Sequence, residues 1–265
     1  MVTILEPGIY DGAGYTDLPP GLSYSGAKDI LRSPARYKAK REQPRVPSEA
    51  MELGTIIHAL VLDQPFCWRE IEGGYGVTKR REAARAAGLV PITSEELAGA
   101  GLIALAVLED EQAVALIERC AHERREVTAV AQDPETGVWV RGIFDGLDDG
   151  GRYGLDLKTG REDTLDDFAR TAANLGYDIQ AATYLSIMEW LGEPLEAFYF
   201  VVVETAPPYF VGVRELDAEF VGLGRRKLRR ALDTYAECVA SGVWPGPPSY
   251  QTVSAPMWAL RQEGM

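Results

Sequence analysis

The stretch from Glu126 to Lys158, EVTAVAQDPETGVWVRGIFDGLDDGGRYGLDLK, reads as three short β-strands joined by two tight turns. Three runs are rich in β-branched and aromatic side chains, which favour strands: 126–130, 138–145 and 153–159. Between them, residues 133–137 place Asp and Pro where a type I turn prefers them, and residues 148–151 read Asp-Asp-Gly-Gly, a strong hairpin signal. The stretch therefore predicts an antiparallel meander.

The register of this meander follows from the lengths of its two loops, because residues directly opposite each other in an antiparallel pair share a face. A four-residue first loop places Glu126 opposite Asp145. A Gly-Gly second loop places Asp145 opposite Asp156, whereas an Asp-Gly second loop leaves Asp156 one diagonal away on the same face. Asp156 and Lys158, two residues apart on one strand, share a face in either register.

Three carboxylates beside one lysine suggest a cation site. Carboxylates this close raise one another's pKa unless a cation lies between them, and oxygen ligands of this kind suit Mg²⁺ or Mn²⁺. Such an ion activates water and polarises a phosphodiester, while Lys158 can orient that water or neutralise developing charge. The alternative is a hairpin with a solvated acidic face, which is common in acidic proteins.

The pattern of Asp145 followed by Asp156-x-Lys158 resembles the signature of the PD-(D/E)xK nuclease superfamily, which is a weak motif by itself. Phe144 stands where the superfamily name has proline. The resemblance implies an α/β fold with a restriction-endonuclease-like core, in which a mixed β-sheet is flanked by helices. Helical patterns upstream add an N-terminal helical region.

Two helix motifs extend the resemblance. Residues 176–184 are similar to the Gln-x-x-x-Tyr helix of the RecB-like branch, with Gln180 and Tyr184 one turn apart on one face. Residues 54–60 resemble the helix that supplies that branch with a metal-ligating histidine, here His58. From spacing alone, the alternatives are a core tyrosine with the glutamine at its rim and a satisfied core histidine.

An ordered set of segments narrows the resemblance to the phage RecE/exonuclease VIII-like nuclease domains and covers most of the chain, from about Gly21 to Trp258. The segments are 21–26, 33–37, 58–63, 156–159 and 244–258. The metal ligands that this resemblance implies are His58, Asp145, Asp156 and the carbonyl of Leu157. The catalytic residues that it implies are Asp145, Asp156, Lys158, Glu126, Gln180 and Tyr184. In these roles Glu126 lies near a second ion or its water, Lys158 activates the nucleophile, and the last two residues orient the DNA strand.

The resemblance implies a Mg²⁺- or Mn²⁺-dependent exodeoxyribonuclease that degrades linear double-stranded DNA, 5′ to 3′, for phage-type homologous recombination. It also implies a homo-oligomer and a single-strand annealing protein as partner. Two alternatives stay open: a RecB-like single-strand or flap nuclease, and a non-catalytic scaffold that binds DNA ends for an annealing protein. A scaffold has no need of Lys158 beside both carboxylates, which argues against the second alternative.

The composition sets further bounds. The chain has 265 residues, a length that fits one large domain, and no apolar run approaches the ~18 residues of a membrane span. Its first residues lack the features of a secretory signal, so we expect a cytoplasmic protein. The resemblance implies a phage or prophage protein in a bacterial host. The three cysteines are far apart and odd in number, which argues against a disulfide framework or a zinc site. They are also one short of the four that hold the iron–sulfur cluster of some RecB-like nucleases, so we expect no such cluster.

The net charge of −13 is unfavourable for a DNA-binding protein, but the positive side chains are clustered. The clusters lie at 32–45, 79–85 and 225–230. The candidate DNA contacts are Arg32, Arg36, Lys38, Arg225, Arg226 and Lys227. Together the clusters favour a groove that follows the DNA backbone, although each alone is also typical of a solvated helix face.

We expect a single nuclease domain over 1–265. Its parts are a mainly helical region 1–125, the catalytic sheet and Gln-x-x-x-Tyr helix over 126–215, and a C-terminal helix and tail over 216–265. The predicted helices begin with Ser25 as an N-cap and include 94–122, broken near Gly99 and Gly101, and one starting at Thr164. Residues 75–90 are the least readable, and we expect a loop there.

Overall fold

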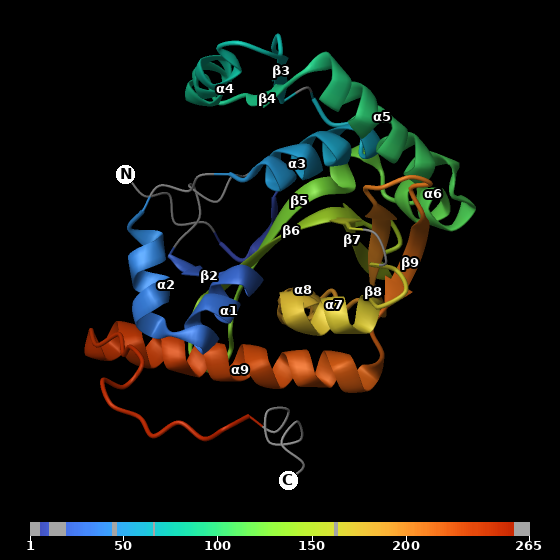
Figure 1. Cartoon of the computed structure of the whole chain (residues 1–265). Helices are drawn as coiled ribbons and strands as arrows, with labels where there is room; N and C mark the ends of the chain where they lie inside the picture. The colour runs from blue at the N-terminus through green and yellow to red at the C-terminus, as the bar shows by residue number, and fades with distance from the viewer. Residues whose placement is uncertain (1–5, 11–19, 44–46, 66, 162–163, 257–265) are drawn as a thin grey trace, which may run out of the picture.

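The computed structural model describes residues 6–10, 20–43, 47–65, 67–161 and 164–256. Arg45 of the first basic cluster and Trp258 of the C-terminal motif lie outside the described residues. Within them, a mixed β-sheet carries helices on both faces, which confirms the predicted fold class (Figure 1). No helix of this part of the chain is long and apolar enough to cross a membrane.

The main sheet has seven strands among the described residues: β1 (Gly8–Tyr10), β2 (Gly21–Leu22), β5 (Arg125–Gln132), β6 (Trp139–Leu147), β7 (Tyr153–Gly160), β8 (Ala197–Glu204) and β9 (Val211–Glu215). Their order is β1-β5-β6-β7-β8-β9, and β2 pairs with β6 beside this path. β7 and β8 run parallel, as do β2 and β6, and the other neighbours are antiparallel. A separate parallel pair is formed by β3 (Trp68–Glu70) and β4 (Val90–Ile92).

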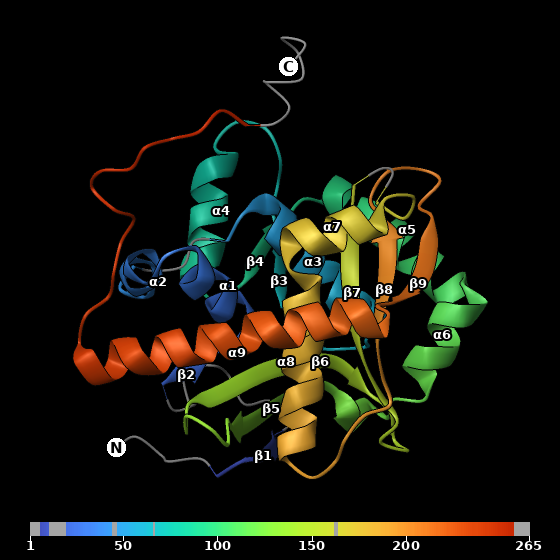
Figure 2. The same ribbon diagram turned by 90° about the horizontal axis from the view of Figure 1, so that it is seen from below.

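The helices are α1 (Tyr24–Arg32), α2 (Pro34–Arg41), α3 (Glu49–Val61), α4 (Val77–Ala86), α5 (Ser94–Glu109), α6 (Glu111–Glu118), α7 (Phe168–Leu175), α8 (Tyr177–Trp190) and α9 (Ala218–Ser241), with a 3₁₀ turn at His122–Arg124. α3, α5 and α6 cover one face of the sheet. α8 covers the other face, with α1 and α9 beyond it (Figure 2).

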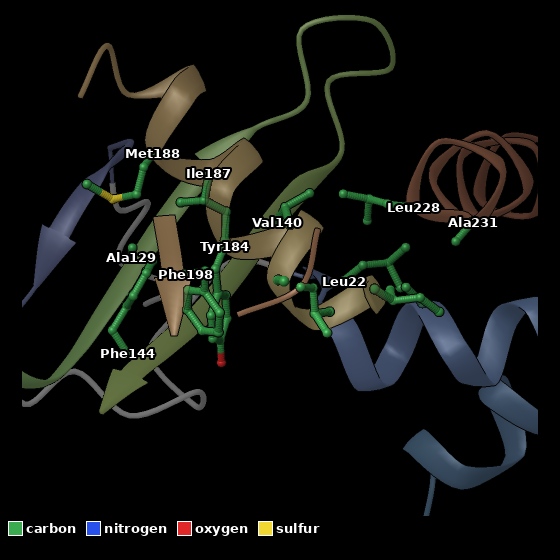
Figure 3. Close-up of a cluster of buried hydrophobic side chains, with 14 of the residues drawn as sticks. Leu22, Ala129, Val140, Phe144, Tyr184, Ile187, Met188, Phe198, Leu228 and Ala231 are labelled. Atoms are coloured by element: carbon green, nitrogen blue, oxygen red, sulfur yellow. The ribbon is translucent and has the colours of Figure 1, made fainter. Parts of the chain in front are cut away.

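The alternation of β8 shows how the sheet divides the interior into two cores. Phe198 (Figure 3) points into the core shared with α8 and α9, as do Phe200 and Val202. Val201 and Val203 point into the core under α3, α5 and α6. A strand that is buried on both faces reads as a continuous apolar run, as this one does. Polar side chains can therefore reach solvent from this sheet only where the apolar packing on its faces is interrupted.

The predicted meander is confirmed, and its register is the one that brings the acidic residues together. β5 and β6 pair in a register that places Glu126 opposite Asp145, as a four-residue first loop predicts. β6 and β7 pair Gly146 with Leu155, which places Asp145 opposite Asp156 when it is continued by one residue. The register is therefore that of the Gly-Gly loop.

Three predictions for the helical region are wrong in detail. The first helix is capped by Ser23, not Ser25, because the Ser23 hydroxyl accepts a hydrogen bond from the Gly26 amide. α5 runs without a break through Gly99 and Gly101. The predicted long helix is interrupted instead at Asp110, which is the N-cap of α6. The segment 164–167 forms turns, and the helix begins at Phe168.

Within the segment 75–90, residues 77–86 form helix α4 and not the expected loop. The sequence of α4 lacks the apolar spacing of a typical helix, because Ala84 is its buried residue and arginine side chains make its other contacts with the fold. Arg80 donates hydrogen bonds to the carbonyls of Glu72, Gly73 and Tyr75, and Arg85 binds the buried Glu52 carboxylate of α3 through two nitrogens. These long-range contacts leave no periodic signal in the sequence.

Gly224 sets how closely α9 can approach α8. A Cβ atom at this position would lie 2.0 Å from the carbonyl oxygen of Asp178, a backbone atom that has little freedom to move. Gly222, two residues earlier on α9, has no such neighbour, because a Cβ atom there would meet only the flexible end of the Arg226 side chain, at 3.6 Å. The two glycines therefore provide a matched pair.

Gly224→Ala is expected to lower the free energy of unfolding by about 1–3 kcal/mol, because the added methyl group separates α8 from α9. Gly222→Ala is expected to be neutral or to stabilise by up to about 1 kcal/mol, since alanine favours a helix more than glycine does. Urea denaturation of both variants measures the difference. Equal stability of the two would contradict the close packing described here.

Candidate active site

Three side chains from different elements meet at one end of the sheet. His58 of α3, Glu126 of β5 and Asp145 of β6 each offer a ligand atom within 4.8 Å of the other two. The Nδ1 atom of His58 lies 3.5 Å from Oδ2 of Asp145 and 3.7 Å from Oε1 of Glu126. Asp145 is buried, and His58 and Glu126 are partly exposed, so the cluster is open to solvent on one side.

The strands lose their simple alternation where Glu126 and Asp145 lie. Phe144 and Leu147 both enter the core that contains α8, although residues three apart face opposite sides of a regular strand. Glu126 has a φ of 54°, in the left-handed region that is uncommon for residues other than glycine. The carboxylates are therefore gathered around a distortion of the sheet, which differs from the single continuous face predicted from the sequence.

Asp156 and Lys158 lie on the α8 side of β7. Leu155 and Leu157, which alternate with them, point into the opposite core. The Lys158 Nζ atom is 2.6 Å from Oδ2 of Asp156, and the amide of Gln180 donates a hydrogen bond to Oδ1 of the same carboxylate. Each oxygen of Asp156 thus contacts a positively polarised group.

A single backbone amide links the two halves of this acidic centre. The N–H group of Leu157 donates a hydrogen bond to Oδ2 of Asp145 at 2.5 Å, so Asp145 lies beside the peptide that follows Asp156. His58 and Glu126 lie next to Asp145, in the first of these halves. The structure thus places His58 and Asp145 of the predicted metal site in one cluster, with Asp156 beside it and engaged by Lys158 and Gln180. The ligand role of the Leu157 carbonyl stays a prediction.

Lys158 is held by aromatic rings as well as by its carboxylate. Its Nζ atom lies 4.8 Å from the ring centroid of Tyr177, 5.9 Å from that of Tyr24 and 6.0 Å from that of Phe200. Cation–π contacts of this length favour a charged ammonium group. Burial opposes the charge, but the Asp156 carboxylate outweighs it and raises the pKa of Lys158.

The electrostatics of the centre distinguish its two aspartates. Burial, with repulsion from Asp145, raises the pKa of Asp156 to about 6, even though Lys158 acts in the other direction. Asp145 is also buried, but His58 outweighs this and holds the pKa of Asp145 below its ordinary value. Burial opposes protonation of His58 as well, yet Asp145 and Glu126 raise the pKa of His58 well above its ordinary range.

The donor set fits a divalent cation. Carboxylate oxygens are the ligands that Mg²⁺ and Mn²⁺ prefer, and an imidazole nitrogen is acceptable to Mn²⁺. An imidazole binds a cation only in its neutral form, so a cation at this site would compete with a proton on His58. A positive ion in place of that proton keeps the buried Asp145 carboxylate compensated.

Gln180 and Tyr184 turn out to have different places. Gln180 reaches Asp156, so it is part of the acidic centre. Tyr184 is buried, its hydroxyl donates a hydrogen bond to the carbonyl of Ile143, and its ring stacks on Phe144 with centroids 4.6 Å apart. Its contacts therefore match the core alternative, and its role in orienting a DNA strand stays a prediction.

The basic clusters are not equally available for binding. Arg32, Arg36 and Lys38 are exposed on α1 and α2, and Arg226 is exposed on α9. Two other candidates are engaged within the fold: Arg225 pairs with Glu189 at 2.8 Å, and Lys227 pairs with the buried Asp178 at 2.5 Å. In the middle cluster, Arg80, Arg81 and Arg85 bind carbonyls or carboxylates of their own chain. These three arginines stabilise the fold, so they are not available to the predicted DNA-binding groove.

Sequence reasoning missed the aromatic residues around Lys158. Tyr24 and Tyr177 both lie inside segments that carry the family resemblance, 21–26 and 176–184. Their place in these segments is the one feature of the sequence that points to them. Nothing in the sequence indicates that residues so far apart converge on one lysine. That convergence follows from the crossing of α1 and α8 on the same face of β7.

His58→Ala is expected to weaken Mn²⁺ binding about 10- to 100-fold, because it removes a nitrogen ligand that lies 3.5 Å from Asp145. Isothermal titration calorimetry with Mn²⁺ measures the change. His122, which contacts the carbonyl of Asp63, provides the control: His122→Ala should leave Mn²⁺ affinity unchanged. A lower melting temperature with unaltered Mn²⁺ affinity in the His58 variant would identify His58 as a core residue only.

Comparison with known proteins places this geometry in context. Residues 23–249 match the model of a family described as a PDDEXK-like domain of unknown function (DUF3799). Among solved structures, a protein described as a "putative exonuclease" from Eubacterium rectale superposes with a TM-score of 0.61 at 16% sequence identity, over 91% of this chain and 92% of that chain. At this identity the likeness shows a shared fold. No curated protein matches the sequence significantly.

Proposed function

Because the chain belongs to the PDDEXK-like family DUF3799, we propose that it is a metal-dependent deoxyribonuclease. The observation that carries the proposal is the junction of the His58, Glu126 and Asp145 cluster with the Asp156–Lys158 pair through one peptide group. A binding module gains nothing from a charged lysine buried against a carboxylate at such a junction. A phosphodiesterase needs a positive group at that place, where negative charge develops in the reaction.

The residues of the chain divide the work by their positions. His58, Glu126, Asp145 and Asp156 are the groups that would hold a divalent cation. When bound, that cation supplies Lewis-acid polarisation of the phosphodiester and activation of water. Lys158, adjacent to Asp156, orients the attacking water or neutralises charge on the phosphate. Gln180 fixes the Asp156 carboxylate through its hydrogen bond and so acts as a positioning residue.

The finer proposal is an exonuclease that degrades linear duplex DNA from its 5′ ends, with Mg²⁺ or Mn²⁺ as cofactor. Its support is the ordered set of motifs that resembles the RecE-like domains, together with exposed cations on α1, α2 and α9 for phosphate contacts. A recombination role, an annealing protein as partner, a homo-oligomeric assembly and a phage or prophage origin belong to the same proposal.

Linear duplex DNA is expected to be consumed from its ends in Mg²⁺, while covalently closed circles of the same sequence survive. The reason is that an exonuclease starts from a free terminus. Duplexes labelled at either the 5′ or the 3′ end, sampled over time, report the polarity. Rapid cutting of closed circles would point to an endonuclease on the same fold, and digestion confined to single strands or flaps would favour the RecB-like alternative.

A further inference from the structure

A cavity of about 540 Å³ opens beside Lys158, at the carboxyl ends of the parallel strands β7 and β8. Its walls come from α3, from the segment 158–161 that ends β7, from α7 and from Thr205 after β8. The carboxyl ends of parallel strands are the usual place for a ligand in an open α/β sheet. The volume lies within the range of about 300–1,000 Å³ that is typical of small-molecule sites.

The lining of this cavity combines apolar surface with hydroxyl groups. Tyr177 and Phe168 form an aromatic wall with ring centroids 6.0 Å apart, and Leu53 and Leu175 add aliphatic surface. Hydroxyl groups come from Thr159, Thr164, Thr171 and Thr205, and the charged side chains in the lining are those of Lys158, Arg161 and Asp167. The apolar surface with its hydroxyl groups suits a flat heteroaromatic ring, while Lys158 and Arg161 suit the phosphate groups next to it.

Tyr177 connects the cavity to the acidic centre. Its ring lines the cavity and also lies 4.8 Å from the Nζ atom of Lys158, which lines the cavity as well. If a phosphate group of a DNA strand lies at Lys158, the neighbouring nucleotide of that strand would lie at the mouth of the cavity. Base–aromatic stacking, which is tolerant of sequence, is the common way in which proteins hold single-stranded nucleic acid.

We propose that this cavity, here called the β7–β8 pocket, binds one unpaired nucleobase of the substrate strand next to the phosphate at Lys158. The proposal rests on the proposed nuclease function and deepens it, because it names what the site holds besides the phosphate. It implies that the strand end is unpaired when it reaches the acidic centre. It also implies that base identity has little influence, since the pocket offers stacking surface and adaptable hydroxyl groups.

The test uses Thr171→Trp, which fills the pocket from α7, and Ala173→Trp as the matched control. Ala173 is exposed on the same helix and is not among the residues that line the pocket. The probe is a single-stranded oligonucleotide with 2-aminopurine at or next to either end, in Ca²⁺, and the readout is quenching of its fluorescence. Leu175→Glu, at a lining position that is 46% exposed, provides a second variant that should fold normally.

Wild type and the Ala173 variant should quench the probe saturably, and Thr171→Trp and Leu175→Glu should bind it roughly 5- to 150-fold more weakly, the range expected for one lost stacking contact. An oligonucleotide without a base at the probed position should bind wild type with the same loss. Unchanged affinity in both pocket variants, or no binding by wild type, overturns the pocket. Absence of cleavage in Mg²⁺ with base-dependent quenching intact would instead overturn the proposed nuclease and leave the pocket standing.

Discussion

Asp156→Asn is expected to reduce DNA hydrolysis at least about 1,000-fold, equivalent to ~4 kcal/mol of transition-state stabilisation. The substitution keeps the size of the side chain and the Oδ1 atom that accepts the Gln180 hydrogen bond. It removes the negative charge that a divalent cation and Lys158 both require. Metal-dependent release of acid-soluble nucleotides from linear duplex DNA measures the effect.

Asp166→Asn serves as the control for this variant, because Asp166 is exposed on the segment that precedes α7. It should retain wild-type activity. The Asp156 variant should keep its secondary structure by circular dichroism, with a lower melting temperature, since Lys158 then lies buried without its partner carboxylate. Substantial Mg²⁺-dependent hydrolysis by a folded Asp156→Asn protein would contradict the assignment of Asp156 to the metal site.

Lys158→Met is expected to lower kcat about 100- to 1,000-fold, because it removes the ammonium group and keeps an unbranched stem between Tyr24 and Tyr177. Lys158 also lowers the pKa of Asp156, which is about 6 in its presence. Without the lysine that pKa rises, and a raised carboxyl pKa means that the proton is held to higher pH. Divalent-cation binding should therefore require a higher pH in the variant.

Two readouts separate this result from that of Asp156→Asn. At high pH the Lys158 variant should bind Mn²⁺ with near wild-type affinity and still hydrolyse DNA slowly, whereas the Asp156 variant should bind Mn²⁺ weakly at every pH. Calorimetric Mn²⁺ titrations at several pH values, paired with kinetics, distinguish the two. Wild-type kcat in Lys158→Met would show that the lysine has a structural role alone.

The part of the site that lies on the meander could be predicted because hairpin loops fix register. The four-residue first loop and the Gly-Gly second loop predict the register in which Val127 pairs with Phe144 and Gly146 pairs with Leu155, and the structure has both pairs. Continued by one residue, this register places Asp145 opposite Asp156. The prediction that side chains alternate regularly between the two faces of these strands is wrong near Glu126 and Asp145. The left-handed backbone at Glu126 breaks that alternation, and no residue type in the sequence signals it.

Features built from contacts distant in sequence could not be predicted. Helix α4 is stabilised by arginine side chains that reach other segments, as Arg85 reaches Glu52, so it lacks an apolar period. The Gln-x-x-x-Tyr spacing places both side chains on one helix face but does not say how deep each lies. Gln180 reaches Asp156, and Tyr184 fills the core against Phe144, a difference set by the strands beneath α8.

The most direct test of the central claim is hydrolysis of a linear duplex by the purified wild-type protein, first in EDTA and then after addition of excess Mg²⁺ or Mn²⁺. The cluster of His58, Glu126 and Asp145, with the Asp156–Lys158 pair beside it, predicts no release of nucleotides in EDTA and sustained release once the metal is present. Release at the same rate in EDTA, or no hydrolysis of linear duplex, single-stranded or flap DNA with either metal, would contradict it.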